Sequence, residues 1–129
     1  LAQPSQREYA ERWFLTRAMI EWYYDHYLPA GVDRRHPDAS PLFGEDLAGL
    51  PPALIYTAGF DPLVDEGGAY AERLAAAGVD AHHHCFEDLL HGFALMGGAV
   101  RAARTATDRI VEQMSERLAV APDTTRRAG

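Results

Sequence analysis

An aspartate and a histidine each follow a short segment of this chain that has the length of a strand. Asp61 follows the run 53–58, and His91 follows the run 81–86. A carboxylate that accepts a hydrogen bond from an imidazole fixes the tautomer of the ring and stabilises its protonated form, which prepares the other ring nitrogen to act as a general base. Brought together, these two residues would form the acid and base parts of an acyl-transfer triad.

A triad also needs a nucleophile, and no serine of the chain qualifies as one. The three serines stand in the sequences PSQ, ASP and MSE, at Ser5, Ser40 and Ser115. None has the flanking glycines that a strained strand-to-helix nucleophile turn requires. We also find no loop that would supply the donors for an oxyanion. The chain alone is therefore predicted to be inactive in acyl transfer.

The segments 53–58 and 81–86 are predicted to be neighbouring parallel strands. The run 53–58 (ALIYTA) is typical of a strand buried on both faces, and 81–86 is a second strand. Between them, 66–77 has apolar residues at helical spacing and ends at Gly78, a typical helix terminator. Strand, helix and strand of these lengths form a βαβ unit with a right-handed crossover. Since the carboxyl ends of parallel strands meet at one edge of a sheet, we predict that the aspartate and the histidine lie within hydrogen-bond distance there.

Helices are predicted on both sides of this unit. Ser5 and Glu8 have the spacing of a capping box, and aromatic residues recur at helical spacing as far as Tyr27. The pattern predicts one helix of about six turns, from Ser5 to Tyr27. Its aromatic stripe is interpreted as core rather than as a ligand-binding wall, because an apolar helical stripe usually faces the core. A last helix is predicted over 99–118.

The remaining segments are predicted to be irregular. Residues 32–51 are rich in Asp, Pro and Gly and indicate a loop, with at most a helical turn at 45–48. Residues 1–120 are predicted to form one partial domain, and 121–129 a disordered tail.

Composition narrows the class of partner and the compartment. The chain has 129 residues and a formal charge of -7, and all twelve basic residues are arginine, so no basic face is predicted for nucleic acid. No apolar run is long enough to span a bilayer. The single cysteine, Cys85, has no internal disulfide partner, which favours a reducing compartment and a cytoplasmic location. The strand 53–58 is expected to have an unpaired edge, through which the isolated chain would self-associate.

Three consecutive histidines and the cysteine invite a metal-site interpretation. His82 and His84 would project from one face of the strand, whereas His83 and Cys85 would project from the other. Because the four side chains alternate between faces, we predict no metal site. No cofactor is predicted either.

The sequence around the aspartate and the histidine resembles a known family. The segments LPPALIYTAGFDPLVDE (50–66) and FEDLLHGF (86–93) are similar to the acid and histidine blocks of the hormone-sensitive-lipase-like α/β-hydrolases, also called bacterial family IV esterases. The predicted first helix and the triplet SPL at 40–42 are also similar, so the resemblance covers 5–118. It implies the C-terminal part of an α/β-hydrolase fold, with the N-terminal part of the sheet and the nucleophile turn absent from this chain.

The resemblance implies a serine carboxylesterase or lipase that acts on a small ester through an acyl-enzyme. Asp61 matches the triad acid and His91 the general base, and the serine is missing from this chain. The framework around them matches at Pro62, Leu63, Asp65, Glu66, Gly92 and Phe93. Asp88 departs from the family, which commonly has glycine there, and this departure predicts an altered loop before the histidine.

Three alternatives stay open. An amidase or arylformamidase of the same fold would use the same two residues. A non-catalytic ligand-binding or scaffolding protein is disfavoured by His91, because the receptors of this family lose the histidine. A truncated product without a function of its own is the third.

Overall fold

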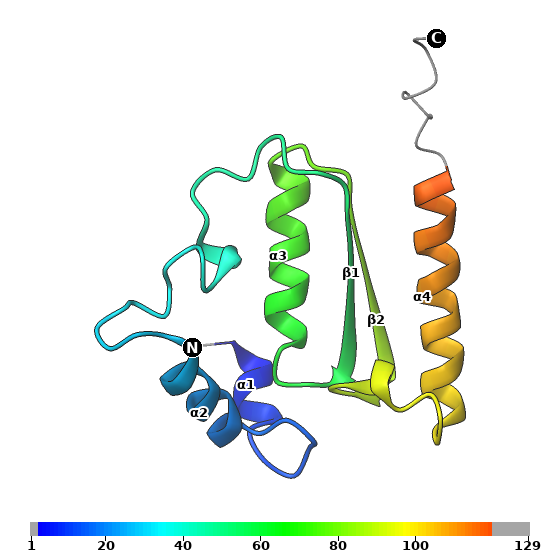
Figure 1. Ribbon diagram of the computed structural model, residues 1–129, viewed down its shortest axis with the longest axis horizontal. Helices are drawn as coiled ribbons and strands as arrows, with labels where there is room; N and C mark the ends of the chain where they lie inside the picture. Colours follow the sequence, from blue (N-terminus) through cyan, green and yellow to red (C-terminus); the bar gives the residue numbers. More distant parts are fainter. Residues whose placement is uncertain (1–2, 120–129) are drawn as a thin grey trace, which may run out of the picture. The chain divides into compact units, whose positions relative to one another are not determined.

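The computed structural model describes residues 3–119, which divide into two compact units, 3–92 and 93–119 (Figure 1). Each unit is described by itself. That residues 1–120 form one domain stays a prediction, and the tail predicted at 121–129 lies outside the described residues.

The first unit contains the predicted βαβ unit. Its strands are β1 (Ala53–Phe60) and β2 (Ala81–Leu90), which pair in parallel, and α3 (Val64–Ala76) connects them. Figure 1 shows α3 running alongside the two strands. Gly78 follows the helix in the left-handed region, with a φ of 82°, as expected of a helix terminator. The parallel βαβ prediction is therefore confirmed, although each strand runs further toward its carboxyl end than the apolar pattern indicates.

A β-bulge separates the two ends of the strand pair. Ala58 pairs with Phe86, but Phe60 pairs with Leu90, so β2 passes four residues while β1 passes two. A Cβ atom on Gly59 would overlap the Glu87 carbonyl oxygen and lie 2.7 Å from the Glu87 Cα, so only glycine fits this close approach. Because β2 has two extra residues here, His91, which follows Leu90, comes level with Asp61, which follows Phe60.

The core of the first unit lies between the sheet, α3 and the preceding loop. Its buried members are Leu47, Leu74 and Val79, with partly buried residues packed against them. Within β1, Thr57 and Ala58 are buried and the other residues are half-buried, so the predicted burial on both faces is only partial. The sheet of the described residues has two strands, so each strand also has an open edge.

The prediction of one long N-terminal helix is also wrong. The structure has a short helix, α1 (Pro4–Glu8), and a separate helix, α2 (Arg17–Tyr27). Between them the chain bends, and Arg12 has a φ of 74°. Thr16 begins the second helix as its N-cap, with its Oγ1 accepting the Met19 N–H.

The capping box predicted at the start of that helix is absent. Gln3 is the N-cap of α1 and makes no side-chain cap, while Ser5 lies inside the helix. The polar groups of Ser5 instead bind residues about sixty positions further along the chain. These tertiary contacts replace the local cap that the spacing suggests.

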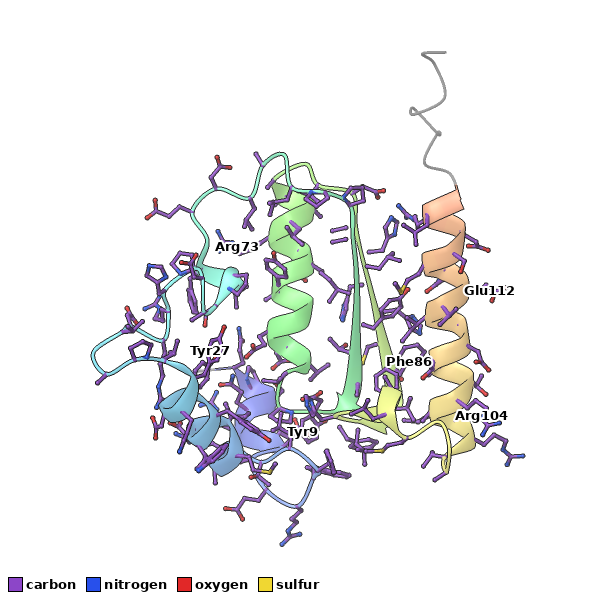
Figure 2. All side chains as sticks on the ribbon, in the orientation of Figure 1. Tyr9, Tyr27, Arg73, Phe86, Arg104 and Glu112 are labelled. Atoms are coloured by element: carbon purple, nitrogen blue, oxygen red, sulfur yellow. The ribbon has the colours of Figure 1, made fainter. Side chains whose placement is uncertain are left out.

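The aromatic stripe of α2 does not form a core in the described chain. Ile20 is buried, but Tyr23 and Tyr27 are exposed by 52 and 75% (Figure 2 labels Tyr27). Trp22, which is not part of the predicted stripe, is also exposed and stacks on His26 of the same helix, with ring centroids 4.0 Å apart. The core interpretation of this stripe is therefore wrong for these residues.

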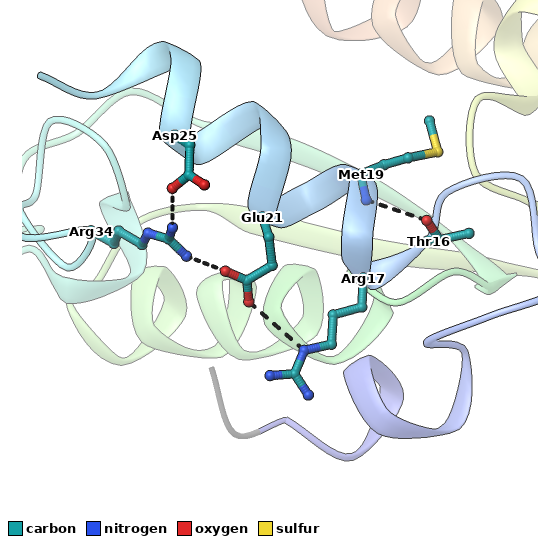
Figure 3. A network of polar contacts seen from close by, with 6 residues as sticks. All are labelled: Thr16, Arg17, Met19, Glu21, Asp25 and Arg34. Carbon is teal, nitrogen blue, oxygen red and sulfur yellow. Dashed lines mark hydrogen bonds and ion pairs between the residues drawn. The ribbon is translucent and has the colours of Figure 1, made fainter. Parts of the chain in front are cut away.

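Two arginines fasten the long connection between α2 and β1. Arg34 donates to Glu21 and to Asp25 on successive turns of α2, at 2.5 Å each (Figure 3). Arg73 of α3 donates to the carbonyl oxygens of Leu42 and Gly44. Leu42 lies within η1 (Pro41–Phe43) and Gly44 directly follows it, so the one helical turn of this loop precedes the predicted position at 45–48. The proline at the first position of the turn favours this placement.

The second unit contains η2 (Phe93–Leu95) and α4 (Arg101–Ala119). The last helix thus begins two residues later than the sequence predicts. The Arg104 Nε–H, in the first turn of α4, donates to the carbonyl oxygen of Gly97 at 2.9 Å and fastens the preceding turn to the helix (Figure 2 labels Arg104). Within residues 3–119, no helix is both long and apolar enough to cross a membrane.

Candidate active site

The structure brings Asp61 and His91 together at the carboxyl edge of the sheet. His91 Nδ1 lies 2.8 Å from Asp61 Oδ2. Asp61 is buried, with 9% of its side chain exposed, whereas 36% of the His91 side chain is exposed. The predicted contact between the two side chains is therefore present, with the carboxylate enclosed and the imidazole accessible.

The bulge in β2 makes this contact possible. Asp61 follows Phe60 and His91 follows Leu90, and these two preceding residues are register partners. Without the extra residues of the bulge, the register of the earlier part of the sheet would set Leu89 beside Asp61. Gly59, which permits the bulge, is thus a site residue that the sequence analysis missed. A lone glycine within a strand pattern is the signal that would have indicated it.

The loop after β1 donates two hydrogen bonds to Asp61 and leaves Oδ2 for His91. Its Oδ1 accepts the Leu63 N–H at 2.9 Å, and its backbone oxygen accepts the Val64 N–H at 3.1 Å. Because an ionised carboxylate only accepts hydrogen bonds, the proton of the contact belongs to His91 Nδ1. The Nε2 atom of that ring then carries a lone pair, as a general base requires.

Two further carboxylates, Asp65 and Glu66, lie in the first turn of α3. Asp65 Oδ2 accepts the Ser5 N–H at 2.8 Å, and Glu66 Oε2 accepts the Gln6 Nε2–H at 2.9 Å. Burial raises the pKa of Glu66, the hydrogen bond from Gln6 opposes that rise, and the nearby charge of Asp61 adds to it. Negative charge is therefore concentrated at this end of the helix, where the helix dipole favours it.

The serines are bound elsewhere. Each hydroxyl donates to a backbone carbonyl: Ser5 to Pro62, Ser40 to Arg34 and Ser115 to Val111. Ser5 is the one beside the acid loop, but it is buried, with 3% of its surface exposed. Every serine hydroxyl is therefore engaged with the backbone, and none lies at a strand-to-helix turn.

The histidine run of β2 is engaged in separate contacts. His82 Nε2 lies 2.8 Å from Asp80 Oδ1, and His83 Nε2 lies 2.9 Å from Thr57 Oγ1. Across residues 3–119, no three His, Cys, Asp or Glu side chains are grouped as metal ligands would be. Asp88 lies in the bulge with an exposed side chain, so the departure from the family pattern falls where the strand is irregular.

Comparison with known proteins places these residues in a family. A sequence profile described as alpha/beta hydrolase fold matches residues 1–95. The carboxylic ester hydrolase LipN of Mycobacterium tuberculosis is 49% identical over 80 residues, which cover 61% of this chain and 21% of LipN. The ethyl acetate hydrolase of Pseudomonas putida is 34% identical over 116 residues, covering 90% of this chain and 36% of that protein.

Solved structures give the same result. The hyperthermophilic esterase of Pyrobaculum calidifontis superposes with a TM-score of 0.83 at 34% identity, over 90% of this chain and 38% of the esterase. The chain thus spans well under half the length of these relatives. On the profile match and these identities, the chain belongs to the α/β-hydrolase fold family, in its hormone-sensitive-lipase-like branch.

Proposed function

We propose that this chain carries the acid and the base of a serine carboxylic ester hydrolase. The observation that supports the proposal is the 2.8 Å contact between His91 Nδ1 and Asp61 Oδ2 at the carboxyl edge of two parallel strands. The enclosed carboxylate orients the ring, and the exposed ring is open to a reacting group. The names of the relatives favour an ester over an amide as substrate.

In the proposed reaction, a serine outside this chain attacks the ester carbonyl carbon, and His91 Nε2 takes the serine proton. The resulting tetrahedral intermediate collapses when the C–O bond to the alcohol breaks, and the imidazolium returns the proton to the departing oxygen. Water then attacks the acyl-enzyme, giving its proton to Nε2, and the serine is regenerated as the acid leaves. Throughout, Asp61 stabilises the imidazolium and holds its orientation.

We propose a small carboxylic ester as substrate. One relative is named for the hydrolysis of ethyl acetate, and this supports a short acyl group and a small alcohol. Hydrolysis of an amide or of an arylformamide by the same two residues stays a prediction, as does a cytoplasmic location.

The chain alone is expected to be inactive, because its serines are bound to backbone carbonyls. The purified chain should hydrolyse p-nitrophenyl acetate no faster than its His91→Ala variant does. A free imidazole cleaves activated esters slowly, which makes this variant the necessary control. An acyl-enzyme burst that survives dialysis would reveal a nucleophile in the chain and contradict the proposal.

Activity should return when the missing part is supplied. We would co-express this chain with the upstream part of the Pyrobaculum calidifontis esterase and isolate the complex by size-exclusion chromatography. His91→Ala and Asp61→Asn should each lower kcat by about 10³- to 10⁴-fold. His82→Ala is the matched control, since His82 is exposed and bonded to Asp80, and it should leave kcat unchanged. A complex that forms and turns over equally well without His91 would overturn the assignment.

The same chromatography tests the proposed self-association of the isolated chain. The open edges of the two-stranded sheet support it. The apparent mass should rise with concentration in the isolated chain and should not rise in the reconstituted complex. A concentration-independent monomer would contradict self-association.

A further inference from the structure

The first helix is too short to be held by its own backbone and has no apolar anchor. It contains five residues, and its buried residues, Ser5 and Gln6, are both polar. An isolated helix of this length is unstable in water. Its position must therefore come from the partners of these two side chains.

All of those partners belong to the loop and helix that follow Asp61. The Ser5 hydroxyl donates to the Pro62 carbonyl oxygen at 2.9 Å, inside the protein. The two further bonds described above run from the Ser5 N–H to Asp65 and from the Gln6 amide to Glu66. These bonds join residues 57 to 60 positions apart, so they form only with the tertiary fold.

The segment after α1 packs against the residue that precedes the aspartate. The Trp13 ring stacks on Phe60 with centroids 4.6 Å apart, and Tyr9 meets Phe60 edge-on at 6.1 Å. Phe60 directly precedes Asp61, and Pro62 directly follows it. The aspartate is thus flanked by two residues that the N-terminal segment holds, one through its ring and the other through its backbone oxygen.

Pro62 needs an external anchor. As a proline it has no N–H, so its carbonyl is its only backbone hydrogen-bonding group. Pro62 is fully buried, and a buried carbonyl without a donor is costly. The Ser5 hydroxyl meets this need from outside the loop.

We infer that Ser5 and Gln6 are positioning residues that hold the Asp61 loop in place and thereby set the orientation of His91. The inference rests on the proposed function, because positioning matters to catalysis only if Asp61 and His91 are the acid and the base. The His91 Nδ1–H donates its orienting hydrogen bond to Asp61 Oδ2. A displacement of the loop by a fraction of an ångström would weaken that bond and release the ring, and misplacements of this order are costly in enzymes.

The test measures the His91 ring directly and needs no activity. We would label the chain with ¹⁵N-histidine and record the ring nitrogen shifts of His91, which report the Nδ1–H and Nε2–H tautomers. The wild-type chain should show the Nδ1–H form, and Ser5→Ala should shift the ring toward a mixture of both. Ser40→Ala is the matched control, since Ser40 also donates its hydroxyl to a backbone carbonyl, and it should leave the ring unchanged.

Two more variants separate positioning from general destabilisation. Ser5→Thr keeps the hydroxyl and should restore the wild-type tautomer. Gln6→Met removes the contact to Glu66 and also removes Gln6 Oε1, which is buried without a partner, so little stability should be lost. It should shift the tautomer in the same direction as Ser5→Ala, by less, and it carries the test if Ser5→Ala does not fold.

In the reconstituted complex, Ser5→Ala should lower kcat by about tenfold and change KM less than about twofold, since the loop orients the base rather than binding substrate. A His91 tautomer that is unchanged in both Ser5→Ala and Gln6→Met would overturn the inference. That result is distinguishable from a failure of the proposed function, which would appear as a correct tautomer in a complex without turnover.

Discussion

The loop around Asp61 and the outer surface of α2 are held by opposite kinds of contact. Around Asp61 the hydrogen bonds join residues 30 to 60 positions apart, and their groups are buried or partly buried. On α2, Arg34 reaches Glu21 and Asp25, which are 13 and 9 positions away, and the three side chains are 36 to 66% exposed. The first set forms only with the complete βαβ unit, whereas the second needs little more than the helix and its following loop.

This difference predicts how the two regions respond to change. Buried polar contacts in a low-dielectric setting are costly to break and little affected by salt. Exposed ion pairs contribute little and are screened. Variants in the two regions should therefore differ in both the size and the salt dependence of their effects.

The largest effect is expected at Gly59. Gly59→Ala sets a Cβ against the Glu87 carbonyl, where backbone rather than a flexible side chain must move. We expect a loss of about 3 kcal/mol or more in the free energy of unfolding, measured by urea titration, because overpacked sites of this kind cannot relax. The Nδ1–H signal of His91 should be lost with the bulge.

Gly98→Ala provides the control, since nothing lies within 4 Å of a Cβ at that position. It should change the stability by less than about 0.5 kcal/mol. Equal stabilities of the two variants would mean that the bulge does not depend on the glycine.

An intermediate effect, in the stabilising direction, is expected from Glu66→Gln. The raised pKa means that folded Glu66 binds its proton more tightly than unfolded Glu66 does. Its contribution to stability is therefore present below the ordinary pKa of 4.5 and is lost as the pH rises through the folded value. The glutamine side chain of the variant cannot ionise, and its amide can also donate to the unpartnered Gln6 Oε1. We expect a gain of about 0.5 to 1 kcal/mol at pH 7.

The gain should shrink toward pH 4, where wild-type Glu66 is itself protonated. Thermal unfolding between pH 4 and pH 8 measures this, with Glu72→Gln, an exposed position on the same helix, as the control. A Glu66→Gln variant that is less stable than wild type at pH 7 would show that the charge of Glu66 is needed for its contact with Gln6.

The contrast between the two regions also explains what the sequence could predict. The contact of Asp61 with His91 follows from the order of two strands and one helix, which apolar periodicity reveals. The extension of both strands and the bulge could not be predicted from that periodicity, because Gly59 and the polar stretch at 87–88 interrupt the apolar pattern. The strands continue through this stretch because their backbones stay paired, which the side-chain pattern does not show.

The N-terminal helix was predicted wrongly for a related reason. Ser5 and Glu8 have the spacing of a local cap, but the serine binds Pro62 and Asp65, contacts that no local pattern contains. Threonine is a typical N-cap residue, so Thr16 could have been recognised as the true cap. It was missed because the aromatic residues keep their helical spacing across it. The exposure of Tyr23 and Tyr27 could not be foreseen either, because a periodic stripe does not say whether a partner covers it.

The smallest effect is expected at Arg34, whose ion pairs lie on the exposed surface of α2. Arg34→Ala removes the two ion pairs that Arg34 makes with α2 (Figure 3) and a contact over the Tyr24 ring, whose centroid lies 5.2 Å from the guanidinium carbon. We expect Tm to fall by about 2 °C at low salt and to match wild type in about 1 M NaCl, since exposed pairs are screened. The hydrogen bond from Arg34 lowers the pKa of Glu21, so the contribution of this pair to stability is present above the ordinary value of 4.5 and is lost as the pH falls through the folded value.

Arg34→Lys should recover only part of the loss because lysine lacks the fork that bridges two carboxylates. Arg35→Ala, which removes a cation over the Phe43 ring instead of an ion pair, is the control whose effect should not depend on salt. A fall in Tm for Arg34→Ala that persists at this high salt concentration would mean that α2 is held as the acid loop is, by contacts that solvent does not reach.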